Sequence, residues 1–140
     1  MDRINQAYTT LLQAYSSLKD AIEDFENVLD CNESQRTQRT YRDSIIKRFE
    51  FCYELLWKYG KTYLLFYHQT EILSPKPVFS ELYKKGITSR QEDIALKEIA
   101  DIRNLTTHTY NEEYVIKAAE EIIEHYQVLE KLLPKIAPTP

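Results

Sequence analysis

Glycine is scarce in this sequence, with only Gly60 and Gly86 among 140 residues. Loops that cradle phosphate groups need several glycines at fixed spacing, so this scarcity excludes most of them. Gly60-Lys61-Thr62 resembles the end of a P-loop, but Leu55 stands where that motif requires its first glycine. The flanking residues predict the middle of a helix, and we therefore expect no phosphate loop here.

Long apolar runs are missing as well. The longest is Leu64-Leu65-Phe66 with tyrosines beside it, far short of the roughly 20 residues that cross a bilayer. The first residues lack the basic and apolar stretches of a secretory signal, which favours a cytoplasmic location without a membrane span. Hydrophobic residues make up 43% and charged residues 29% of the chain, which is typical of one globular domain over residues 1–140.

Sequence signals for metal or disulfide chemistry are weak. Cys31 and Cys52 have no Cys or His partner at ligand spacing. Glu121, Glu124 and His125 lie close together, but the second Glu-x-x-His motif of di-iron bundles is absent. We expect structural roles for these residues, no metal and no cofactor.

Apolar residues recur at steps of three and four over most of the chain, which predicts helices. The expected long helices cover residues 4–29 and 35–68, and their short connection requires antiparallel packing. A short helix is expected over 78–85 with Gly86 as its cap. Ser89 and Glu92 form a capping box before a further helix, and Asn111 caps a last helix over 112–133 that Pro134 stops. The prediction is an all-α, up-and-down antiparallel four-helix bundle with one additional short helix.

The segment from Arg103 to Tyr110 gathers a cation, a proton-transfer group and a phenol. On a continuous helix Arg103 and His108 would lie about 140° apart, since each residue turns the helix by roughly 100°. The threonines between them favour a helix end instead, which would bring the polar groups together. A guanidinium can grip phosphate oxygens while an imidazole moves a proton near neutral pH.

This combination suits cleavage of RNA, in which the neighbouring 2′-hydroxyl is the nucleophile. In that interpretation Arg103 stabilises charge at phosphorus and His108 is the general base or acid. Asn104 would orient the substrate, and Tyr110 would donate a hydrogen bond or carry a modification. The alternative is a polar helix cap, in which Arg103 pairs with an acidic neighbour and His108 is structural.

Basic residues also recur along the second predicted helix. Arg36, Arg39 and Arg42 are spaced by three, and Lys47 and Arg48 follow. They could form a phosphate-binding face, with Arg42 and Arg48 as substrate contacts, or a solvated surface balanced by acidic residues of another helix. The net charge of −4 argues against general nucleic-acid binding, so any contact with RNA must be local.

Two motifs together resemble a known family. Residues 42–58 follow the pattern RD..I.RFEF..EL.WK, and Ser74-Pro75 and the segment from Arg103 to Glu112 follow in the same order. The chain resembles HEPN domains of the nucleotidyltransferase substrate-binding subfamily. The resemblance implies a homodimeric helical bundle with a separately encoded minimal nucleotidyltransferase as its partner. The Gly-Ser and paired aspartates of such an enzyme are missing here, so this chain is not that enzyme.

The resemblance also implies a function for the polar segment. In HEPN ribonucleases, the arginine and histidine of this motif from two subunits meet in a cleft at the dimer interface and cleave RNA without a metal. The resemblance implies these roles for Arg103 and His108. In toxin and antitoxin pairs the partner attaches AMP to the tyrosine that corresponds to Tyr110 and silences the toxin. The sequence therefore predicts such a toxin. A non-catalytic subunit that presents a substrate to the nucleotidyltransferase is the alternative, and a purely structural helical dimer is a third possibility.

Overall fold

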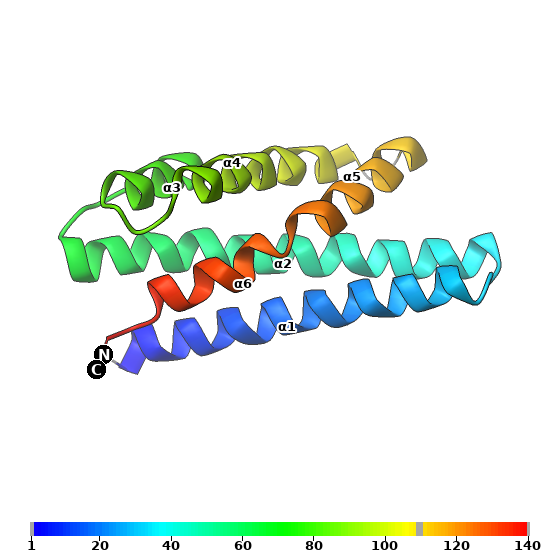
Figure 1. Cartoon of the computed structure of the whole chain (residues 1–140), viewed down its shortest axis with the longest axis horizontal. Coiled ribbons are helices and arrows are strands. Elements are labelled where there is room, and N and C mark those ends of the chain that lie inside the picture. The colour runs from blue at the N-terminus through cyan, green and yellow to red at the C-terminus, as the bar shows by residue number, and fades with distance from the viewer. Residues whose placement is uncertain (1, 109–110, 140) are drawn as a thin grey trace.

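The computed structural model describes residues 2–108 and 111–139. The described residues form helices, turns and short connections, and no strand occurs among them (Figure 1). The all-α prediction is confirmed. None of the helices in the described part of the chain is long and apolar enough to span a membrane.

The first two helices form a long antiparallel pair. α1 spans Asp2–Asp30 and α2 spans Gln35–His68, as the apolar periodicity predicted (Figure 1). Between them Asn32 takes a left-handed conformation with φ of 54°, and the Ser34 hydroxyl caps α2 by accepting the Thr37 amide at 3.2 Å. The facing stripes bury their apolar side chains, among them Leu11, Leu18 and Ile22 of α1 and Ile45, Phe49 and Leu56 of α2.

α3 (Pro75–Lys84) packs against α2 and leads into α4 (Arg90–Leu105). α3 begins at Pro75 instead of residue 78, because proline is well accommodated in the first helical turn. Gly86 has a φ of 76°, and the amide of Ile87 bonds to the Leu82 carbonyl at 2.9 Å, which ends α3 in a Schellman motif. The capping box of Ser89 with Glu92 is confirmed by bonds of 2.8 and 3.1 Å.

Gly60 has a packing role. It is buried in the middle of α2, and a Cβ placed on it would stand 2.9 Å from Val78 Cγ1 of α3. The absence of a side chain therefore lets α3 approach α2 closely. The resemblance of Gly60-Lys61-Thr62 to a P-loop has no structural counterpart.

The predicted single helix over 112–133 is interrupted at residues 126–127. α5 spans Glu112–His125, α6 spans Val128–Leu132, and a 3-10 turn over Leu133–Ile136 follows. At the break, the amides of Leu129 and Glu130 bond three residues back instead of four. Contacts with α1 hold the redirected chain, since Lys19 bonds to Glu130 at 2.8 Å. Pro134 lies inside the final 3-10 turn and does not end the helical segment.

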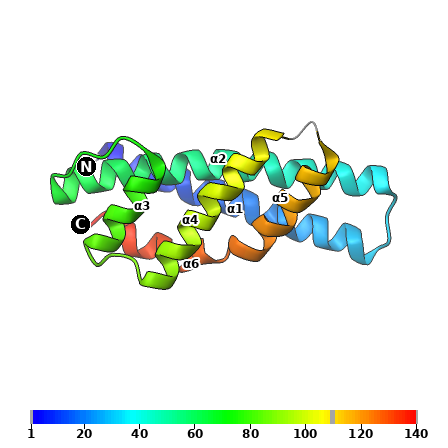
Figure 2. The same cartoon turned by 90° about the horizontal axis from the view of Figure 1, so that it is seen from above.

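The helices form two layers around one apolar core. α1 and α2 make one layer, and α3, α4 and α5 lie over α2, while α6 returns across the long pair to bring the two termini near each other (Figure 1). α4 and α5 run side by side and antiparallel, and the end of α4 lies at the edge of the bundle (Figure 2). This end carries the described part of the polar segment of interest.

Candidate functional site

The end of α4 separates Arg103 from His108, as predicted. α4 stops at Leu105, and Thr106–His108 form a 3-10 turn. The Thr106 hydroxyl donates to the Arg103 carbonyl and the Thr107 hydroxyl donates to the Asn104 carbonyl, both at 2.7 Å. These bonds supply side-chain donors to carbonyls in the last turn of the helix. The threonines thus shape the helix end.

Arg103 is anchored on α2. Its Nη1 lies 3.1 Å from Glu50 Oε2 and also donates to Thr106 Oγ1 at 3.1 Å. The side chains of Arg103 and Glu50 are 26% and 34% exposed, so solvent screens this pair less than a surface pair. Arg103 Nε is buried and has no hydrogen-bond partner among the described residues. The predicted alternative, in which Arg103 pairs with an acidic neighbour, describes this contact correctly.

His108 closes the 3-10 turn and is exposed. Its imidazole packs against the phenol ring of Tyr114 in the first turn of α5, with ring centroids 5.4 Å apart. Asn104 is also exposed. Tyr110, the predicted modification site, lies outside the described residues. The exposed imidazole of His108 thus follows the partly buried guanidinium of Arg103 by five residues. The guanidinium contacts α2 and the imidazole contacts α5.

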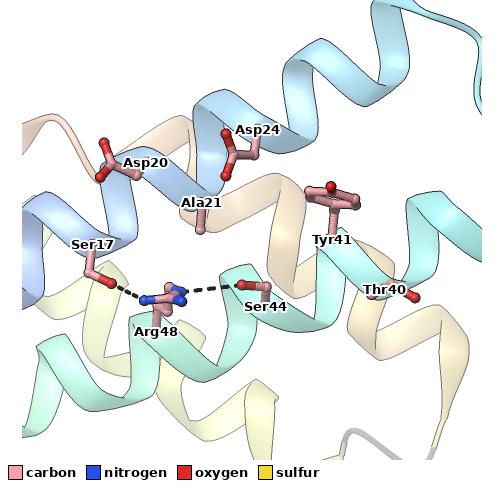
Figure 3. Close-up of a pocket in the computed structure, with 8 residues that line it drawn as sticks. All are labelled: Ser17, Asp20, Ala21, Asp24, Thr40, Tyr41, Ser44 and Arg48. Atoms are coloured by element: carbon pink, nitrogen blue, oxygen red, sulfur yellow. Dashed lines mark hydrogen bonds between the residues drawn. The ribbon is translucent and has the colours of Figure 1, made fainter.

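Arg42 and Arg48 lie elsewhere, on the side of α2 that faces α1. Arg48 donates to the hydroxyls of Ser17 and Ser44 (Figure 3), and the Arg42 guanidinium lies 5.5 Å from the centre of the Phe25 ring. Arg48 lines a groove of about 440 Å³ between α1 and α2 that also has Asp20 and Asp24 on its wall. The structure does not bring Arg42 and Arg48 together with Arg103.

The remaining basic and acidic candidates have structural partners. Arg39 pairs with Glu112 of α5 at 3.1 Å, which agrees with a surface balanced by another helix. His125 Nε2 lies 2.5 Å from Glu98 Oε2 and its Nδ1 lies 2.8 Å from the Glu121 carbonyl. Partial burial alone would lower the pKa of His125, but these two hydrogen bonds outweigh it and raise the pKa above its ordinary value.

The described residues that were considered as metal ligands or reactive thiols form no metal-binding cluster and no activated thiol. Over residues 2–108 and 111–139, no three His, Cys, Asp or Glu side chains cluster closely enough to hold a metal ion. Cys52 is buried, and burial raises the pKa of its thiol to about 12, which keeps it protonated and unreactive at neutral pH.

Sequence reasoning did not assign Glu50, Thr106 or Tyr114 to the site. Glu50 was visible only as part of a charged stripe with Glu54 and Lys58, spaced by four. That spacing predicts contacts within α2, and Glu54 does pair with Lys58 at 3.6 Å. It says nothing of α4. Only the packing of α4 on α2 reveals that Glu50 faces Arg103.

Comparison with known proteins identifies the family. A family model described as nucleotidyltransferase substrate binding protein like matches residues 13–136. The chain belongs to the nucleotidyltransferase substrate-binding protein family. This confirms the family resemblance that residues 42–58 and 103–112 indicated. No curated protein sequence matches the chain at a significant level.

Two solved structures share the fold of this family member. A protein from Thermus thermophilus is 25% identical over 86% of this chain and 99% of its own, with a TM-score of 0.67. A Shewanella oneidensis HEPN toxin, solved in tri-AMPylated form in complex with an MNT antitoxin, is 18% identical over 90% of this chain and 95% of its own, with a TM-score of 0.65. This chain thus shares its helical fold with a HEPN toxin.

Proposed function

We propose that this protein is the HEPN toxin of a two-gene pair, acting as an endoribonuclease through Arg103 and His108 and restrained by a minimal nucleotidyltransferase. One observation carries the proposal: the partly exposed guanidinium of Arg103 lies in the last turn of α4, and the exposed imidazole of His108 lies on the 3-10 turn that follows at the edge of the bundle. The complex of the Shewanella HEPN toxin with an MNT antitoxin supports the choice of partner.

The proposed reaction uses the RNA's own 2′-hydroxyl as nucleophile and calls on no metal. The imidazole of His108 takes the proton of the 2′-hydroxyl, whose oxygen attacks the adjacent phosphorus. The bond from phosphorus to the 5′-oxygen breaks, and an imidazolium returns a proton to that oxygen. Arg103 donates hydrogen bonds to the phosphoryl oxygens as their negative charge grows. The products are a 2′,3′-cyclic phosphate and a 5′-hydroxyl.

A homodimer suits this chemistry because it supplies two copies of His108. One neutral imidazole can act as base while the other, protonated, acts as acid, which a single histidine cannot do in one step. We therefore place the active cleft where the Arg103 and His108 turns of two protomers meet. Asn104, exposed at the end of α4, is the proposed contact that orients RNA. Contacts of Arg42 and Arg48 with RNA would belong to a separate surface.

Tyr110 is the proposed control point. Its phenol oxygen would attack the α-phosphorus of ATP bound to the partner, with pyrophosphate as leaving group and loss of the phenol proton. The attached AMP would add bulk and negative charge two residues from His108. RNA would then be excluded from the turn by steric overlap and by charge repulsion.

The family description favours a second candidate, a non-catalytic subunit that presents a substrate to the nucleotidyltransferase. The contact between Arg103 and Glu50 is compatible with it, because an arginine already paired with a carboxylate is less available to phosphate. In this case Tyr110 would be nucleotidylated without any cleavage of RNA.

One set of experiments separates the two functions. The purified chain, free of partner, is incubated with RNA, beside His108→Ala and Arg103→Ala. We expect cleavage by the wild type, none by His108→Ala, and much slower but measurable cleavage by Arg103→Ala. An intact RNA with wild-type protein would overturn the toxin proposal. Mass measurement after incubation with partner and ATP should show one or more added AMP groups that Tyr110→Phe removes, under either function.

A further inference from the structure

Glu50 and Arg103 connect the two sequence motifs of this chain in space. Glu50 lies within the motif of residues 42–58 on α2, and Arg103 begins the polar segment at the end of α4. Oε2 of Glu50 lies 3.1 Å from Nη1 of Arg103, and both side chains are about two-thirds or more buried. Sequence resemblance assigns no role to Glu50. Its position does, because it touches the arginine of the proposed catalytic pair.

Nη1 of Arg103 is held from two sides. Besides Glu50, it contacts the hydroxyl of Thr106, which lies 3.1 Å away. Thr106 is itself immobilised, since its side chain is buried and its hydroxyl donates to the Arg103 carbonyl at 2.7 Å. A guanidinium is planar and rigid. Two contacts on one nitrogen, together with the fixed start of the side chain on α4, therefore set the direction of the whole group.

The opposite edge of the guanidinium carries the donors that remain. Nε is buried and has no hydrogen-bond partner in the described part of the chain, and Nη2 takes no part in the contacts that Nη1 makes with Glu50 and Thr106. A buried N–H without a partner is destabilising, so such a group calls for an explanation. The N–H donors of a guanidinium match the oxygens of a phosphate. Glu50 contacts Nη1, and Nε is enclosed by protein, so the N–H donors of Nη2 are the ones left for an anion.

We propose that Glu50 is a positioning residue, which turns Arg103 so that the N–H donors of its Nη2 are presented to the phosphate of RNA. This inference rests on the proposed ribonuclease function. Glu50 does not touch the reacting atoms and acts only through Arg103. Its contact also explains why the two motifs occur together: the first supplies the carboxylate that orients the arginine of the second.

Glu54 provides a matched control one turn further along α2. Its carboxylate accepts a hydrogen bond from Trp57 Nε1 at 3.2 Å and pairs with Lys58 at 3.6 Å. It is thus an acidic residue of the same helix in an ion pair of its own, and it does not contact Arg103. A general effect of removing charge from α2 would appear in Glu54→Gln as well as in Glu50→Gln.

The first test is RNA cleavage by the full chain. We expect Glu50→Gln to lower kcat about 10- to 100-fold, the usual effect of losing a residue that orients an active group, with a smaller change in KM. Glu50→Asp should recover part of the activity, and Glu54→Gln should match the wild type. In an Arg103→Ala background, Glu50→Gln should cause no further loss, because the two residues act as a unit. Full activity of Glu50→Gln, or additive losses, would overturn the inference.

The second test does not depend on cleavage. Nitrogen-15 NMR of the arginine side chains reports whether the Arg103 guanidinium rotates, with Arg103→Lys to assign its signals. We expect separate Nη signals in the wild type and in Glu54→Gln, and averaged signals in Glu50→Gln. Unchanged Arg103 signals in Glu50→Gln would overturn the inference. If the wild type leaves RNA intact but Glu50→Gln releases Arg103, the ribonuclease function fails while the orienting contact stands.

Discussion

Glu50 of α2 and Arg103 of α4 form an ion pair with 3.1 Å between Oε2 and Nη1, and this pair joins two motifs that are far apart in the sequence. The guanidinium is thereby fixed at the end of α4, beside the 3-10 turn that carries His108. The geometry of the site therefore depends on the packing of α4 against α2 and on the contacts that hold the surrounding helices in place.

Loss of Glu50 should weaken the fold as well as the site. Glu50→Ala leaves the partly buried charge of Arg103 without its ion-pair partner, so we expect the free energy of unfolding to fall by about 1–2 kcal/mol. Urea denaturation measures this. Glu54→Ala is the control and should cost less, because Glu54 and Lys58 are 41% and 62% exposed. Equal losses in the two variants would argue against a special role of the Glu50 contact.

The capping box at the start of α4 should contribute measurably to stability. The Ser89 hydroxyl accepts the Glu92 amide at 3.1 Å, and loss of an N-cap typically costs about 1 kcal/mol. Ser89→Ala should therefore lower the urea midpoint. Ser16→Ala, at an exposed position in the middle of α1, should leave the midpoint unchanged or raise it slightly because alanine favours helix. A Ser89→Ala midpoint like that of the wild type would show that the cap is dispensable.

The stabilising effect of His125 should depend on pH. Its pKa is raised in the folded protein, as burial is outweighed by hydrogen bonds to the Glu121 carbonyl and the Glu98 carboxylate. Protonation therefore stabilises the fold below the ordinary pKa of about 6.5, and this contribution is lost as pH rises through the raised value. His125→Gln should be more destabilising at about pH 6 than at about pH 9. Unfolding by urea at both pH values tests this. A difference in unfolding free energy between the wild type and His125→Gln that is larger at the higher pH would contradict the prediction.

Hydrogen bonds that involve tyrosine hydroxyls of α2 should hold the C-terminal residues against this helix. The buried Tyr59 hydroxyl donates to the Ile136 carbonyl at 2.5 Å. Tyr59→Phe leaves that carbonyl without this donor, and we expect a loss of about 1 kcal/mol. The Tyr67 hydroxyl accepts the exposed amide of Thr139 at 2.9 Å, which water can replace, so Tyr67→Phe should cost less. Denaturation curves that rank the two variants in the opposite order would refute this assignment.

Local signals in the sequence were sufficient for most helix ends. The capping box of Ser89 and Glu92, the cap by Asn111 and the left-handed Gly86 act through bonds within a few residues, so they can be recognised without tertiary structure. The end of α4 before His108 follows from the threonines in the same way. For these elements sequence and structure agree because the competing interactions are local.

The break after α5 and the anchoring of Arg103 could not be predicted in this way. The apolar spacing of residues 112–133 fits one continuous helix. The break between α5 and α6 is accompanied by contacts with α1, such as that of Lys19 with Glu130, which this spacing does not reveal. Glu50 likewise fits a stripe within α2. The partner of Glu50 depends on which face of α2 packs against α4, and the regular spacing of residues along α2 does not reveal this.

Cleavage of an RNA with one modified position tests the central claim most directly. The purified wild-type chain is given a short RNA, and the same RNA with a single 2′-deoxy nucleotide on the 5′ side of a cut bond. The account predicts a 2′,3′-cyclic phosphate and a 5′-hydroxyl at that bond, loss of this cut in the modified RNA, and no cleavage by His108→Ala. Cleavage at the 2′-deoxy position, or equal activity of His108→Ala, would contradict it.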